Sequence, residues 1–136
     1  MPERQIYDRP LSDRPRLVKL GVKPGHRISV LGVDEPVFAG ELEDAGANVS
    51  LRLRRDSDII IYAADSFRDL DRLTDLRRYI VSNGAIWVVR RKGKDAPIRD
   101  IDVIEAGLAA KMVDNKIAAF SETHAAMRLV IRLVDR

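Results

Sequence analysis

The chain has 136 residues, of which 46% are hydrophobic and 33% charged, and its formal net charge is +3. This length suits one domain with a single core. Because cysteine is absent, disulfides, thiolate metal sites and cysteine nucleophiles are excluded, and the two separated histidines, His26 and His124, give no reason to expect a metal site. No apolar run approaches the ~20 residues that span a bilayer, and the charged first residues are unlike a signal peptide. We therefore expect a cytoplasmic protein without membrane contact.

The N-terminal segment differs from the rest in charge and in proline content. Residues 1–16 contain three prolines and no apolar periodicity, which predicts an extended arm ahead of a single domain over residues 17–136. Residues 1–27 hold seven basic and three acidic residues, so the positive excess belongs to this end. A basic arm is suited to an acidic partner or to nucleic acid, although a solvated tail has the same composition.

The body begins with a strand, a helix and a second strand. Residues 27–32 form a short apolar run closed by glycine, which predicts a buried strand. Asp34 and Pro36 are typical of a helix start, and Gly46 of its end. Residues 48–54 alternate between apolar and polar side chains, which predicts a half-exposed strand.

The middle of the chain repeats this alternation of strand and helix. Residues 58–64 are nearly all apolar and β-branched, as in a central parallel strand. A helix is predicted next, starting at Asp65 and Ser66, with an apolar stripe that reaches Ile80 and an end at Asn83-Gly84. Residues 85–89 predict another buried strand.

The last third predicts one helix and a hairpin. Ile101, Ile104 and Leu108 mark a helix that stops near Gly107. The strand-like runs 112–120 and 127–134 are too close for a parallel crossover, so they form an antiparallel hairpin. The whole pattern predicts an α/β fold, a three-layer Rossmann-like sandwich with a mainly parallel sheet and a C-terminal antiparallel hairpin.

Ligands of such sheets bind beyond the carboxyl ends of the strands. Basic residues follow two of the predicted strands and are candidates for binding an anionic ligand at a shared edge, unless they are simply solvated. The candidates are Arg54, Arg55, Arg90, Arg91, Lys92 and Lys94. Ser121 to His124 combine nucleophile, acid and base types, but their adjacency favours a turn.

The first strand-to-helix crossover argues against a nucleotide cofactor. It holds one glycine, Gly32, followed by Asp34 and Glu35, which repel a phosphate and are expected to fill the space. The second predicted strand ends in arginines rather than in the acidic residue that binds a ribose. The expectation is therefore no cofactor and no metal, with no catalytic residue assigned.

The motifs Tyr7-Asp8-Arg9-Pro10-Leu11 and Lys19 to Gly25 resemble the opening of a family of small uncharacterised bacterial proteins, a domain of unknown function. Gly84-Ala85-Ile86-Trp87 and Lys116 to Thr123 match it further along the chain. Where that family has a tryptophan after the threonine, this chain has His124, and Arg90-Arg91-Lys92 replaces a Pro-Lys-Lys run.

That family is similar in fold to class I S-adenosylmethionine-dependent methyltransferases, which implies a shortened relative with one strand–helix unit missing between Arg55 and Asp58. We therefore expect a non-enzymatic binding or regulatory protein that engages an anionic ligand or acidic partner. The first alternative is a small methyltransferase that binds S-adenosylmethionine around Gly32 and Asp65. The second is a structural homodimer.

Overall fold

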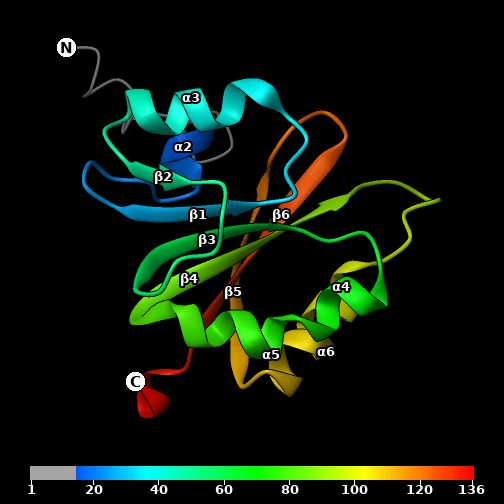
Figure 1. Ribbon diagram of the computed structural model, residues 1–136. Coiled ribbons are helices and arrows are strands. Elements are labelled where there is room, and N and C mark those ends of the chain that lie inside the picture. Colours follow the sequence, from blue (N-terminus) through cyan, green and yellow to red (C-terminus); the bar gives the residue numbers. More distant parts are fainter. Residues whose placement is uncertain (1–14) are drawn as a thin grey trace.

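The computed structural model describes residues 15–136, which form a six-stranded sheet in the order β2-β1-β3-β4-β6-β5 (Figure 1). The strands are β1 (Arg27–Leu31), β2 (Asn48–Ser50), β3 (Ser57–Ala63), β4 (Ile80–Arg91), β5 (Met112–Ala119) and β6 (His124–Ile131). Strands β1 to β4 pair in parallel, and β6 is antiparallel to both β4 and β5. The predicted sheet with a C-terminal antiparallel hairpin is thus confirmed.

Helices cover both faces of the sheet and complete the predicted three layers (Figure 1). One face carries α2 (Arg16–Lys19) and α3 (Pro36–Asp44), and the other carries α4 (Phe67–Asp71), α5 (Leu73–Leu76) and α6 (Asp100–Ala109). Residues 15–136 also contain two 3₁₀ turns, η2 (Arg77–Tyr79) between α5 and β4 and η3 (Leu133–Asp135) after β6.

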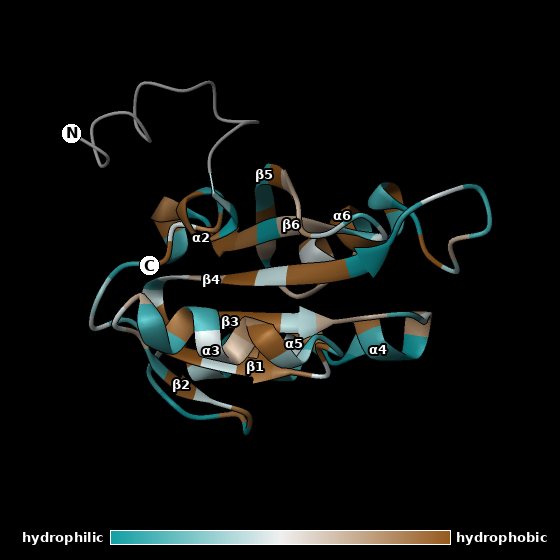
Figure 2. Ribbon diagram, turned by 90° about the horizontal axis from the view of Figure 1, so that it is seen from above, coloured by the Kyte–Doolittle hydropathy of each residue, from teal (hydrophilic) through white to brown (hydrophobic). Residues whose placement is uncertain are grey.

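The central strands supply a core on each face, as their apolar sequences predict (Figure 2). Ile60 and Ile86 pack toward α4, α5 and α6, and the neighbouring Ile61 and Trp87 pack toward α2 and α3. The Trp87 indole N–H donates a 3.0 Å hydrogen bond to the Leu20 carbonyl. Trp87 is therefore a packing residue whose polar atom is satisfied.

Strand β2 is shorter than predicted because only its first three residues pair with β1. After Ser50 the chain turns back, and the Ser50 hydroxyl accepts a hydrogen bond from the Arg52 amide. Leu51 is 69% exposed, whereas Leu53 packs against the core on the face covered by α4, α5 and α6. The alternation of these leucines therefore belongs to a connector over residues 51–56 and not to a strand.

The long helix predicted after β3 is broken and ends early. Arg72 separates α4 from α5, and Ile80 already begins β4. Asn83 and Gly84 therefore lie in β4 and do not end a helix. The predicted stripe is confirmed for Leu70, Leu73 and Leu76, all of which are buried.

Helix α6 also differs from its predicted pattern. Its buried face holds Val103 and Gly107, whereas Ile101 and Leu108 are exposed. Gly107 lies inside the helix because the Leu129 side chain occupies the space where a Cβ would project, 3.0 Å from Leu129 Cδ2. The glycine therefore serves close packing and does not end the helix.

The predicted arm falls outside the described residues, apart from Pro15 and Arg16. Arg16 begins α2 and is bonded to the body. Among the helices of residues 15–136, none is long and apolar enough to cross a membrane.

Candidate ligand-binding site

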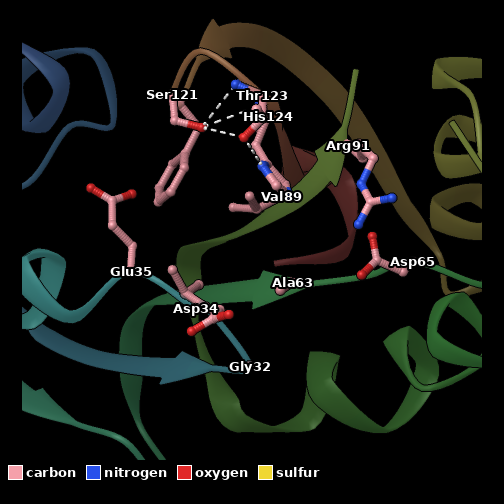
Figure 3. Close-up of a pocket in the computed structure, with 12 residues that line it drawn as sticks. Gly32, Asp34, Glu35, Ala63, Asp65, Val89, Arg91, Ser121, Thr123 and His124 are labelled. Atoms are coloured by element: carbon pink, nitrogen blue, oxygen red, sulfur yellow. Dashed lines mark hydrogen bonds between the residues drawn. The ribbon is translucent and has the colours of Figure 1, made fainter. Parts of the chain in front are cut away.

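A cavity of about 390 Å³ opens at the carboxyl ends of β1, β3 and β4, and we call it the carboxyl-edge cavity (Figure 3). Its volume lies within the range of small-molecule sites. Its lining comprises Gly32, Val33, Asp34, Glu35, Ala63, Asp65, Val89, Arg91, Phe120, Ser121, Thr123 and His124. The structure thus brings together Gly32 and Asp65, as the alternative prediction requires, and adds Arg91 to them.

The first crossover does not fill this space as expected. Gly32 is exposed and has a positive φ of +74°, a conformation that L side chains rarely adopt. Glu35 is held by Arg16, whose Nη1 donates to Glu35 Oε2 at 2.8 Å. The hydrogen bond to Glu35, with a smaller contribution from Glu41, raises the pKa of Arg16. The main chain at Gly32 is therefore accessible from the cavity.

The charged walls of the cavity face each other. Asp65 and Arg91 point toward one another without forming an ion pair (Figure 3). Asp65 lies just before α4, where the Ser66 hydroxyl caps the helix by accepting a hydrogen bond from the Asp69 amide at 3.1 Å. Asp65 itself has no capping role, so its carboxylate is free to meet a ligand.

The remaining wall is the tip of the β5–β6 hairpin, which the sequence predicted only as a turn. The Ser121 hydroxyl accepts a hydrogen bond from the His124 amide at 3.1 Å, which confirms that turn. The Thr123 hydroxyl lies 2.7 Å from His124 Nδ1. His124 pairs with Arg91 across β4 and β6, and this register places the tip over the carboxyl edge.

Arg90 has a structural role that removes it from the candidate anion site. Its Nε and Nη2 atoms both donate to Asp100 Oδ1, at 3.0 and 2.6 Å, and Nη1 donates to the carbonyls of Arg91 and Ile98. These bonds hold the loop over residues 92–99 against the start of α6. Arg91, Lys92 and Lys94 remain exposed at the carboxyl edge.

Arg54 and Arg55 lie at the opposite edge of the sheet, so the predicted shared edge is wrong. Arg54 Nη2 donates to the carbonyls of Asn48 and Ile28, at the beginnings of β2 and β1. The Arg55 carbonyl accepts from Nε of Arg27, the first residue of β1. The physical reason is the early end of β2, which lets the connector carry both arginines back to the amino ends of the strands.

Arg54 is also committed to the fold. Besides its carbonyl contacts, its Nη1 donates to Asn48 Oδ1 at 3.0 Å and its backbone amide donates to the Ser29 hydroxyl. Burial, with a smaller contribution from Arg27, lowers its pKa. Arg54 therefore fastens the connector to the sheet.

Solved structures of several methyltransferases have this arrangement. A TehB-like SAM-dependent methyltransferase from Corynebacterium glutamicum superposes with a TM-score of 0.66 at 12% identity, over 86% of each chain. A SAM-dependent methyltransferase from Aquifex aeolicus matches 94% of this chain and 97% of its own, with a TM-score of 0.65 at 14% identity. The CcbJ methyltransferase from Streptomyces caelestis superposes with a TM-score of 0.65 at 9% identity, over 86% of this chain and 93% of its own.

Sequence comparisons add no relative: no protein-family model matches the chain, and no curated protein matches it. The resemblance to a small bacterial family therefore stays a prediction. Identities this low establish the fold and not the activity. The chain has the Rossmann-like α/β fold of S-adenosylmethionine-dependent methyltransferases.

Proposed function

We propose that this chain binds S-adenosylmethionine, or a small molecule with the same charge pattern, in the carboxyl-edge cavity. The observation that carries the proposal is the charge of the lining. Asp34, Glu35 and Asp65 outnumber the single guanidinium of Arg91, and Arg16 compensates Glu35. One carboxylate is left in excess, so the cavity favours a cationic or zwitterionic ligand over an anion.

S-adenosylmethionine matches this pattern. At neutral pH it carries a sulfonium and an ammonium group against one carboxylate, so it is a net cation. Asp34 and Asp65 suit the positive groups, and Arg91 suits the carboxylate. The fold shared with methyltransferases supports the same ligand.

The adenosine end fits less well. Strand β2 ends at Ser50, followed by Leu51 and Arg52, so no carboxylate stands where Rossmann-like folds bind ribose hydroxyls. Asp34 also replaces the glycine that would let a ligand approach the main chain beyond Gly32. The proposal therefore covers binding of the ligand and not transfer of its methyl group.

Equilibrium dialysis with labelled S-adenosylmethionine tests the proposal, with S-adenosylhomocysteine and AMP as competitors. The expected order of affinity is S-adenosylmethionine first and AMP last. The double substitution Asp34→Asn/Asp65→Asn leaves Arg91 as the excess charge. It should therefore lower the affinity for S-adenosylmethionine at least tenfold and raise the affinity for AMP. Asp44→Asn/Asp71→Asn changes the same charge away from the cavity and should leave the order unchanged. No detectable S-adenosylmethionine binding contradicts the proposal.

An anionic ligand or acidic partner at the basic strand end is a second candidate. Arg91, Lys92 and Gly93 line a shallower hollow of about 550 Å³ with Glu122, Thr123 and His124. Here two cations face one carboxylate, the reverse of the carboxyl-edge cavity. Amide shifts at residues 91–93 and 122–124 on addition of pyrophosphate that are lost in Arg91→Gln/Lys92→Gln would favour this candidate, and absence of shifts there would exclude it.

A further inference from the structure

A second cavity, of about 500 Å³, lies on the other side of the molecule, and we call it the amino-edge cavity. It is lined by Leu53, Arg55, Arg72, Asp75, Leu76, Arg78 and Tyr79. Arg55 and Leu53 come from the connector between β2 and β3, and the others from α5, η2 and the residue before α5. The lining approaches the amino ends of β3 and β4, because Ser57 pairs with Ile80 just beyond it.

The charge of this cavity is positive, because its arginines outnumber its carboxylates. Three guanidinium groups, those of Arg55, Arg72 and Arg78, share the lining with one carboxylate, that of Asp75. Within residues 15–136 none of the three arginines forms an ion pair, in contrast to Arg16 and Arg90. A concave surface that gathers like charges concentrates a field that attracts anions.

Two of these arginines are already held in place. The Arg55 guanidinium lies over the Tyr79 ring, 5.1 Å from its centroid, and that of Arg72 lies over Tyr62 at 5.6 Å. Stacking fixes the plane of a guanidinium while leaving its N–H groups available at the edge. Less side-chain entropy is then lost when an anion binds.

We propose that the amino-edge cavity binds a phosphate group of a small phosphorylated molecule through Arg55, Arg72 and Arg78. Phosphate oxygens accept paired hydrogen bonds from guanidinium groups, and several arginines together suit a multiply charged anion. A hollow of about 500 Å³ matches the size of a small molecule and not that of an extended nucleic acid. This site is independent of the carboxyl-edge cavity, which lies beyond the opposite ends of the strands.

Calorimetric titration of the full chain with inorganic pyrophosphate tests the proposal. Binding is expected, and it should weaken as the salt concentration is raised from 50 to about 200 mM. Arg55→Gln/Arg78→Gln should lower the affinity at least tenfold. Arg68→Gln, at an exposed position of α4 outside the cavity, should leave the affinity for pyrophosphate unchanged.

Two further measurements keep the outcome decisive. Thermal unfolding of each variant separates lost binding from lost folding. If the double variant does not fold, the single substitution Arg78→Gln replaces it, because Arg78 is exposed and makes no side-chain bond within the described chain. Amide shifts confined to residues 53–56 and 77–79 on addition of pyrophosphate would support the site. Absence of pyrophosphate binding, equal binding by Arg78→Gln, or binding of a single-stranded oligonucleotide without pyrophosphate or ADP would each overturn the proposal.

Discussion

Arg16 and Glu35 form a two-pronged ion pair, in which Nη1 reaches Oε2 and Nη2 reaches Oε1, both at 2.8 Å. The pair joins α2 to the crossover beside the carboxyl-edge cavity. The same guanidinium donates to Glu41 and to the Phe120 carbonyl and lies 4.8 Å from the ring centroids of Phe38 and Phe120. One side chain thereby links α2, α3 and the hairpin tip.

Arg16→Gln should therefore destabilise the fold by about 2 kcal/mol, because it breaks several charge-assisted bonds around a mostly buried guanidinium. Urea unfolding at neutral pH measures this change in the free energy of unfolding. Glu41→Gln is the matched control: its carboxylate is 42% exposed, so the loss should stay below about 1 kcal/mol. Equal losses in the two variants would show that Arg16 is not the central member of the cluster.

The substitution Arg16→Gln also releases the charge of Glu35 beside the cavity. The excess negative charge of the lining then rises, so binding of S-adenosylmethionine relative to S-adenosylhomocysteine should become stronger by about threefold. Equilibrium dialysis with both ligands measures the ratio. A ratio that falls instead would argue against charge as the basis of selection.

Tyr62 predicts a dependence of stability on pH. Its buried hydroxyl donates a 2.8 Å hydrogen bond to the Asp69 carbonyl, and burial, followed by the charge of Asp69, raises its pKa. The folded state therefore favours the neutral phenol. The contribution of Tyr62 to the free energy of unfolding is complete below the pKa of an unfolded tyrosine, about 10. It is lost as the pH rises through the higher pKa of the folded state.

Tyr62→Phe should accordingly cost about 1 kcal/mol at pH 8, and the difference from wild type should shrink above about pH 10. Urea unfolding at a series of pH values measures both effects. Tyr79→Phe is the control, since the Tyr79 ring is only half-buried and its hydroxyl makes no hydrogen bond within residues 15–136. A difference that stays constant up to pH 11 would contradict this assignment.

The apolar pattern was sufficient to predict the layers of the fold. The runs around Ile60 and Ile86 are apolar on both faces, and only a central strand between two helical layers accommodates that. Strand β2 was predicted too long because an edge strand is half exposed, so an alternating pattern there does not distinguish a strand from a connector. In this connector Leu51 is exposed and only Leu53 packs against the core. The length of β2 depends on pairing with β1, which no local pattern contains.

The site was harder to predict than the fold, for a related reason. Gly32 and Asp65 could be placed at the carboxyl edge because each directly follows a predicted strand. Arg54 and Arg55 could not, since the turn after Ser50 decides which edge they reach. His124 joins the cavity through its register with Arg91, and register is set by packing across the sheet and not by the composition of the turn.

Gly84 and Gly40 predict opposite effects of the same substitution. A Cβ at Gly84 would lie 2.8 Å from the Asp58 carbonyl oxygen, a backbone atom that cannot easily move. Gly84→Ala should therefore cost about 1–3 kcal/mol by overpacking. Gly40 lies in α3 with nothing within 4 Å of its Cβ position, so Gly40→Ala should stabilise the fold by up to about 1 kcal/mol through helix propensity. Thermal and urea unfolding of the two variants measure the sign directly.

Substitution of Arg90 should loosen the loop over residues 92–99 and leave ligand binding intact. Its side chain is 15% exposed and donates to Asp100 and to the Ile98 carbonyl, which fastens the loop over residues 92–99 beside the buried Ile98. Arg90→Lys keeps the charge but cannot make the forked contact. It should cost about 1–2 kcal/mol and speed hydrogen exchange at the loop amides, among them that of Ala96, which is bonded to the Gly93 carbonyl.

Arg99→Lys is the matched control for that substitution. The Arg99 side chain is 78% exposed and lies 3.9 Å from Asp102, so the change should be below about 0.5 kcal/mol and leave the loop amides protected. Binding of S-adenosylmethionine should persist in Arg90→Lys, because Arg90 does not line the carboxyl-edge cavity. Unchanged exchange in the loop of Arg90→Lys would show that Ile98 packing alone holds this segment against α6.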